Sequence, residues 1–169
     1  LMRILPLVLY LRAIYGADFQ ELDEPFAVIH HVSALTHAHQ RSQIACGLYI
    51  SIASLLLDGI DLERAIRLGI RKAVGYYRRH KEFGQELIHF SRLDNDGFER
   101  TPMAEIDSSG YVVSSLEAAI WCLLNTNDYA SCVLRAVNLG DDTDTVAAIA
   151  GGLAGLVYGH EAIPQAWLD

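Results

Sequence analysis

Apolar residues recur with a helical period along nearly the whole chain, and no stretch shows a convincing strand alternation. Segments with this period cover residues 2–15, 40–58 and 128–138. Asp61 precedes a further segment of this kind and is a good N-cap, because its carboxylate can accept a hydrogen bond from a free amide of the first turn. The pattern predicts an all-α fold in which residues 1–169 belong to one multi-helix, orthogonal bundle-like domain.

The last long helical segment, VAAIAGGLAGLVYG, is unusually rich in alanine and glycine. A glycine inside a helix costs about 0.8–1.0 kcal/mol relative to alanine. Such a cost is tolerated where another backbone must approach closely. We therefore expect this helix to be central.

A different composition separates two of the helical segments. Residues 91–113 hold Asp, Asn, Gly, Ser and one Pro, which predicts a long surface loop. The pattern Ser114-x-x-Glu117 follows this loop and is a capping-box signature, so it predicts a helix start at Ser114.

The chain is acidic, with a formal net charge of −8 over 169 residues. Nucleic-acid-binding domains usually carry a basic face, so this charge argues against a nucleic acid partner. No segment reaches the roughly 20 apolar residues of a membrane span. The three cysteines match no zinc spacing and are typical of core residues in a reducing compartment, so we expect a cytoplasmic protein.

The N-terminus has the pattern of an internal position in a longer protein. Leu1 is not an initiator residue, and the apolar run after Arg3 opens in the middle of a helical pattern. A signal peptide is the alternative, but Arg12 interrupts the run and no small-residue cleavage site follows. We expect an N-terminally truncated domain.

The run Asp141-Asp142-Thr143-Asp144-Thr145 opens the Ala/Gly-rich helix. It has two explanations from residue chemistry alone. Asp and Thr are good N-caps, and carboxylates suit the positive end of a helix dipole. One cap needs only one such residue, however, and three carboxylates repel one another unless a cation lies between them. Carboxylate and hydroxyl oxygens are ligands suited to Mg²⁺ or Mn²⁺.

The stretch AVNLGDDTDTVAAIAGGLAGLVYG is very similar to the C-terminal metal motif of the ADP-ribosylglycohydrolase family. The family usually reads Gly-Gly-Asp-Thr-Asp-Thr, and this chain has Asp141 in place of the second Gly. Other segments resemble the family in the same order. They are MRILPLVLY, the Thr-His motif at Thr36-His37, the helix GYVVSSLEAAIWCLL, and IPQAW.

The resemblance implies that Asp142, Asp144 and Thr145 bind metal, and it gives Asp141 and Thr143 no such role. The family holds two Mg²⁺ ions, with Mn²⁺ as an alternative. Its other ligands are a Thr-Asp-Asp run, which lies with an acidic catalytic residue in the N-terminal part. We find neither in this chain, so the catalytic residue is expected upstream of Leu1, and residues 1–169 hold half of a binuclear site.

His37 matches the family's Thr-His motif and has two explanations. It could lie near the substrate pyrophosphate, or it could be a hydrogen-bonded structural histidine. Metal chelation by His37 and His39 is disfavoured, because on a helix these side chains point about 200° apart.

The family resemblance implies a hydrolase that removes ADP-ribose from a protein side chain or a small acceptor. Its partners would be an ADP-ribosylated protein or a small ADP-ribose conjugate, and the chain by itself is expected to be inactive. One alternative is a non-catalytic ADP-ribose-binding or structural relative of the family. Another is an unrelated helical interaction domain whose Asp/Thr run is only a cap.

Overall fold

The computed structural model describes residues 1–168, and the regular secondary structure of this part of the chain is entirely helical. It contains eight α-helices joined by turns and short 3-10 helices, which confirms the prediction of an all-α fold. None of the described helices is long and apolar enough to cross a membrane. The chain divides into two compact units, one formed by Leu1 with Arg3–Asp96 and the other by Met2 with the residues from Gly97 onward.

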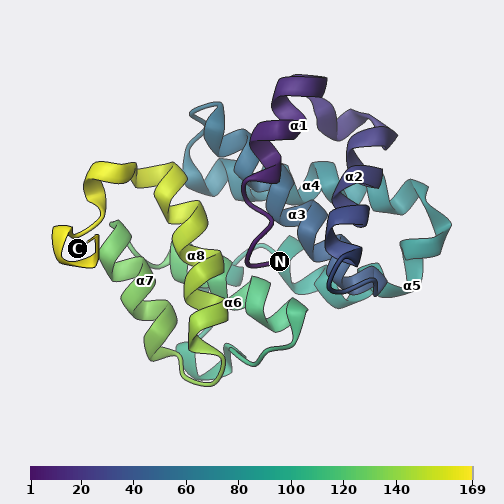
Figure 1. The fold of residues 1–169 in the computed structure, drawn as a ribbon. Helices are drawn as coiled ribbons and strands as arrows, with labels where there is room; N and C mark the ends of the chain where they lie inside the picture. Colours follow the sequence, from purple (N-terminus) through teal and green to yellow (C-terminus); the bar gives the residue numbers. More distant parts are fainter. Residues whose placement is uncertain (169) are drawn as a thin grey trace. The chain divides into compact units, whose positions relative to one another are not determined.

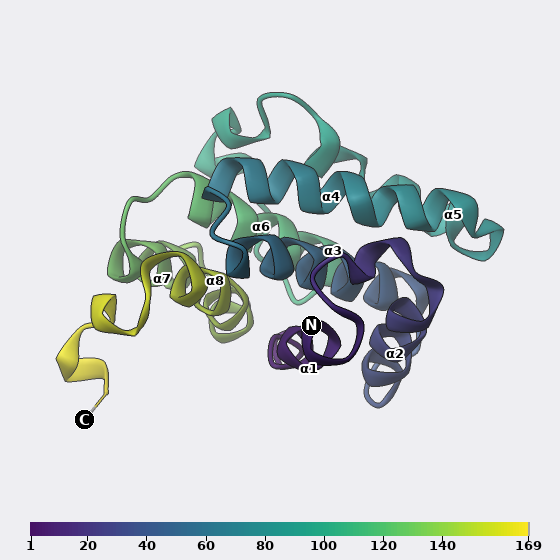
Figure 2. The ribbon, with the colours of Figure 1, turned by 90° about the horizontal axis from the view of Figure 1, so that it is seen from above.

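Helix α3 is the centre of the first unit. It is buried over nearly its whole length, because small and apolar residues lie on every face of it. It packs against each of the other four α-helices of this unit (Figures 1 and 2). The five helices are α1 (Leu7–Tyr15), α2 (Asp23–Ala34), α3 (Gln40–Leu57), α4 (Leu62–Arg79) and α5 (Gly84–Leu87).

Helices α3 and α4 form a tight hairpin. The chain turns at Gly59, whose φ of 74° lies in the left-handed region that favours glycine. Asp61 then caps α4, since its Oδ1 accepts a hydrogen bond from the Arg64 amide at 3.0 Å, as the sequence predicts. Further along, Gly69 faces the α3 backbone, and a Cβ added there would lie 2.8 Å from Cα and N of Ile52.

The second unit contains α6 (Val112–Leu124), α7 (Tyr129–Asn138) and α8 (Thr143–Tyr158). Helix α8, drawn in yellow-green in Figure 1, packs against both of the others. This position explains its many small residues. A Cβ added to Gly151 would lie 3.3 Å from Val133 Cγ2 on α7, closer than most side-chain contacts. The Ala/Gly-rich helix is therefore central within its own unit.

Three expectations about local structure are wrong in whole or in part. Residues 91–113 lie mostly at the surface, as expected, but they are not one long loop, because the 3-10 helices Ile88–Asp94, Phe98–Arg100 and Met103–Glu105 occupy much of the segment and bury Phe98. Helix α6 begins at Val112, so Ser114 lies inside its first turn and caps nothing. The first helix begins only at Leu7, directly after Pro6.

Candidate metal-binding site

The predicted metal ligands lie at the N-terminus of α8. Asp142 occupies the N-cap position, and Asp144 and Thr145 follow in the first turn. The Asp142 carboxylate makes no capping hydrogen bond. Among residues 1–168, no partner hydrogen-bonds or ion-pairs with the side chains of Asp142, Asp144 or Thr145. Their oxygens are therefore available to a ligand, at the positive end of a helix dipole.

The turn before α8 has an unusual backbone. Gly140 has a φ of 93°, and Asp141 follows with a φ of 51°. Asp141 is the only non-glycine residue in the described part of the chain with a positive φ. Two consecutive left-handed residues suit Gly-Gly, which the family usually has here. Aspartate tolerates this conformation better than most residues, so Asp141 preserves the turn.

A loop before α6 holds this turn in place through Ser108, whose exposed fraction is only 2%. The Ser108 carbonyl oxygen accepts a hydrogen bond from the Asp142 amide at 3.2 Å. The Ser108 hydroxyl donates to the Gly140 carbonyl oxygen, also at 3.2 Å. These two bonds join the loop to both sides of Asp141.

Asp107 organises the same loop. Its carboxylate accepts hydrogen bonds from the Ser114 hydroxyl at 2.6 Å and from the Ser109 amide at 2.9 Å. These bonds stabilise the charged form, so they lower the pKa of Asp107, with the Ser114 hydroxyl as the largest cause. Ser114, which the sequence suggested as a helix cap, instead fastens the loop to α6.

Gly110 lies directly against the Asp142 carboxylate. A Cβ at Gly110 would lie 2.8 Å from Asp142 Oδ2, which is closer than real Cβ contacts. Sequence reasoning missed both Ser108 and Gly110. Serine and glycine are common in loops, and only the tertiary fold brings these two residues beside Asp142.

His37 lies in the first unit, after α2, and its side chain is exposed. Its Nδ1 is 3.0 Å from the Thr36 hydroxyl, and its amide donates to the Ser33 carbonyl oxygen at 2.8 Å. The Nδ1 of His39 accepts a hydrogen bond from the Arg41 amide at the start of α3. The two imidazoles therefore have separate local partners. A role for His37 in substrate binding stays a prediction.

The three predicted ligands do not by themselves complete a metal site within the described residues. No group of three or more His, Cys, Asp or Glu side chains comes together among residues 1–168 in a way that could hold a metal ion. Asp142, Asp144 and Thr145 offer two carboxylates and one hydroxyl, the oxygen types that Mg²⁺ takes. They fit one side of a Mg²⁺ site, whose other ligands would be water or further protein groups.

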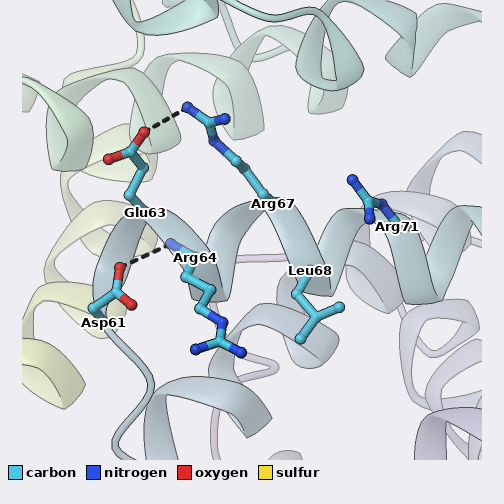
Figure 3. A pocket seen from close by; sticks show the side chains of 6 residues that line it. All are labelled: Asp61, Glu63, Arg64, Arg67, Leu68 and Arg71. Carbon is cyan, nitrogen blue, oxygen red and sulfur yellow. Dashed lines mark hydrogen bonds and ion pairs between the residues drawn. The ribbon is translucent and has the colours of Figure 1, made fainter.

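A separate hollow of about 500 Å³ lies along α4 in the first unit (Figure 3). Three arginines and two acidic residues line it, and Glu63 pairs with Arg67 at 2.5 Å. Its lining contains none of the predicted site residues. The lining residues are Asp61, Glu63, Arg64, Arg67, Leu68 and Arg71.

The sequence profile of the ADP-ribosylglycohydrolases matches residues 1–169. The chain therefore belongs to the ADP-ribosylglycohydrolase family, as its Asp/Thr run suggested.

Three relatives illustrate the match. ADP-ribosylarginine hydrolase Tri1 of Serratia proteamaculans is 32% identical over 89% of this chain and 37% of its own length. Tri1 of Pseudomonas putida is 34% identical over 81% of this chain and 33% of its own length. The ADP-ribosyl-[dinitrogen reductase] glycohydrolase of Rhodospirillum rubrum is 29% identical over 80% of this chain and 39% of its own length. The chain thus spans between about a third and two fifths of these relatives.

Proposed function

We propose that the protein containing this chain hydrolyses the bond between ADP-ribose and an acceptor, with Asp142, Asp144 and Thr145 as part of a binuclear Mg²⁺ site. Family membership supports the reaction class. The observation that supports the site is the set of unpartnered oxygens at the start of α8. The remaining ligands and the catalytic acidic residue would come from a part of the protein outside residues 1–169.

Divalent cations bound there would supply positive charge that holds the hydroxyls of the terminal ribose and positions a water molecule. They would also offset the repulsion between an anionic ligand and a chain with a net charge of −8. The proposed role of three residues of this chain is to bind the cations. Asp142, Asp144 and Thr145 would present oxygens from the N-cap and the first turn of α8.

The acceptor we favour is an arginine side chain. Two of the relatives are named ADP-ribosylarginine hydrolases, and the third is named for ADP-ribosylated dinitrogen reductase. An arginine-linked protein conjugate is therefore the first substrate to test, and small ADP-ribose conjugates are the second.

The test uses the full-length protein with a protein ADP-ribosylated on arginine, and it measures free ADP-ribose with Mg²⁺ and with a chelator. We expect release only with Mg²⁺ and a loss of at least a hundredfold in Asp144→Asn. Asp141→Asn is the matched control and keeps its activity. Tight binding of ADP-ribose without any release would instead support a non-catalytic relative of the family.

A further inference from the structure

We propose that Ser108 and Gly110 are positioning residues that set where the Asp142 carboxylate points, and hence how tightly the site holds a divalent cation. This inference rests on the proposed function, because it takes Asp142 to be a metal ligand. It adds two residues that carry no metal-binding atoms themselves. They lie in the loop before α6, on a different element from the ligands.

Ser108 acts through the main chain of the turn. Its carbonyl oxygen accepts a hydrogen bond from the Asp142 amide, and its hydroxyl donates one to the Gly140 carbonyl oxygen. Ser108 is almost fully buried. Asp141 lies between these two contacts and has a φ of 51°. A non-glycine residue usually prefers backbone conformations with a negative φ. The two bonds to Ser108 stabilise the positive φ and thereby fix the Cα–Cβ direction of Asp142.

Gly110 acts by having no side chain. Its missing Cβ leaves the space that Asp142 Oδ2 occupies, since an added Cβ would lie 2.8 Å away. The backbone φ of Gly110 is not positive, so an alanine fits its backbone conformation. The clash is with the far end of a side chain rather than with backbone. Gly110→Ala should therefore move the carboxylate and leave the fold largely intact.

Hydrogen bonds from α6 hold this loop in place. Asp107 binds the Ser114 hydroxyl of α6 at 2.6 Å, and the Ser115 hydroxyl donates to the Ser109 carbonyl oxygen at 3.0 Å. Two side chains of the first turn of α6 thus hold the loop on either side of Ser108. A ligand position that depends on such supporting bonds is typical of metal sites, where loss of a support lowers metal affinity about 10- to 100-fold.

The experiment is a calorimetric titration of the full-length protein with Mg²⁺ alone, together with melting curves in the presence of a chelator. We expect Gly110→Ala to raise the Mg²⁺ dissociation constant about 10-fold or more, while the Tm without metal moves by only a few degrees. Gly155→Ala is the matched control. It lies on α8 itself, and nothing in the described chain is within 4 Å of its added Cβ, so Mg²⁺ affinity should stay within twofold.

Two further variants separate the possible failures. If Asp142→Asn binds Mg²⁺ like the wild type, the proposed function fails and this inference fails with it. If Asp142→Asn loses Mg²⁺ binding but Gly110→Ala and Ser108→Ala keep it, only this inference is overturned. Ser108→Ala also decides the matter if Gly110→Ala does not fold, since we expect it to weaken Mg²⁺ binding about tenfold by freeing the Gly140 carbonyl.

Discussion

The Asp142 amide donates a hydrogen bond to the Ser108 carbonyl oxygen at 3.2 Å, and this bond ties the start of α8 to the loop before α6. Asp142 is a predicted metal ligand, and its position therefore depends on a contact between segments that are distant in the sequence. In the proposed site, the Asp/Thr run would supply the oxygens and the neighbouring loop would orient the Asp142 carboxylate.

The left-handed backbone at Asp141 leads to a prediction about stability. Glycine adopts a φ of 51° without steric cost, and the left-handed region costs a side-chain-bearing residue about 1–2 kcal/mol, less for Asp. We expect Asp141→Gly to change the free energy of unfolding by no more than about 1 kcal/mol. Asp141→Val should lower it by more than that, because a β-branched residue is strained there. Urea unfolding of both variants measures the difference.

The close approach of α4 to α3 predicts a strong effect of one methyl group. Gly69→Ala forces a Cβ to 2.8 Å from the Ile52 backbone, which cannot move aside as a side chain could. We expect a loss of about 1–3 kcal/mol in urea unfolding. Gly75→Ala on the same helix meets only Arg79 Nη1 at 4.0 Å, and it should stabilise the protein by up to about 1 kcal/mol. Equal effects of the two variants would contradict the packing described.

The half-buried imidazole of His30 predicts a dependence of stability on pH. Burial lowers the pKa of His30 from 6.5 to about 4. Its Nε2 lies 3.1 Å from the Tyr77 hydroxyl, which itself donates to the Gln43 carbonyl oxygen at 2.9 Å. Because the folded pKa is the lower one, the unfolded chain takes up a proton first. Stability should therefore fall as the pH drops from about 6.5 to about 4, and the contribution of His30 is constant outside that range.

The variant His30→Gln tests this origin. It keeps a polar group near Tyr77 but cannot titrate, so we expect a flatter dependence of unfolding free energy on pH between about 4 and 6.5. His160→Gln is the control, because this exposed imidazole is not among the groups that shift the pKa of His30, and the variant should keep the dependence of the wild type. An unchanged slope in His30→Gln would exclude His30 as its cause.

The bond between Ser114 and Asp107 predicts a local titration effect. Ser114→Ala removes the largest cause of the lowered pKa of Asp107, so that pKa should rise toward its ordinary value of 3.8. The stabilisation from this bond is present above pH 3.8 and is lost as the pH falls through the folded pKa of Asp107. Carboxyl chemical shifts in NMR follow the change. Ser131→Ala, which removes a similar bond to Asp128, should leave the pKa of Asp107 unaltered.

The helices were predictable where local chemistry decides them. Asp61 precedes an amphipathic run and caps it, and the apolar run of α3 leaves no alternative to a buried helix. The start of α6 was not predictable in this way. The Ser114–Glu117 pattern imitates a cap, but the Ser114 hydroxyl binds a carboxylate seven positions upstream, which no local rule anticipates.

In the candidate site, too, some residues were predictable from the sequence and others were not. Asp142, Asp144 and Thr145 stand out because three carboxylates and two hydroxyls in one run are unusual before an apolar helix. Ser108 and Gly110 do not stand out, since their importance lies in a packing contact with Asp142. Residue type thus indicates the proposed ligands, and only the three-dimensional structure indicates the residues that we propose orient Asp142.

The most direct test of the metal assignment compares Asp142→Asn with Asp141→Asn in a calorimetric Mg²⁺ titration of the full-length protein. Both variants remove one negative charge from adjacent positions, so they alter the local field almost equally, but only one removes a proposed ligand. We expect Asp141→Asn to bind Mg²⁺ within about threefold of the wild type, and Asp142→Asn to bind at least about tenfold more weakly. Equal affinity in all three proteins would contradict a role for Asp142 as a metal ligand.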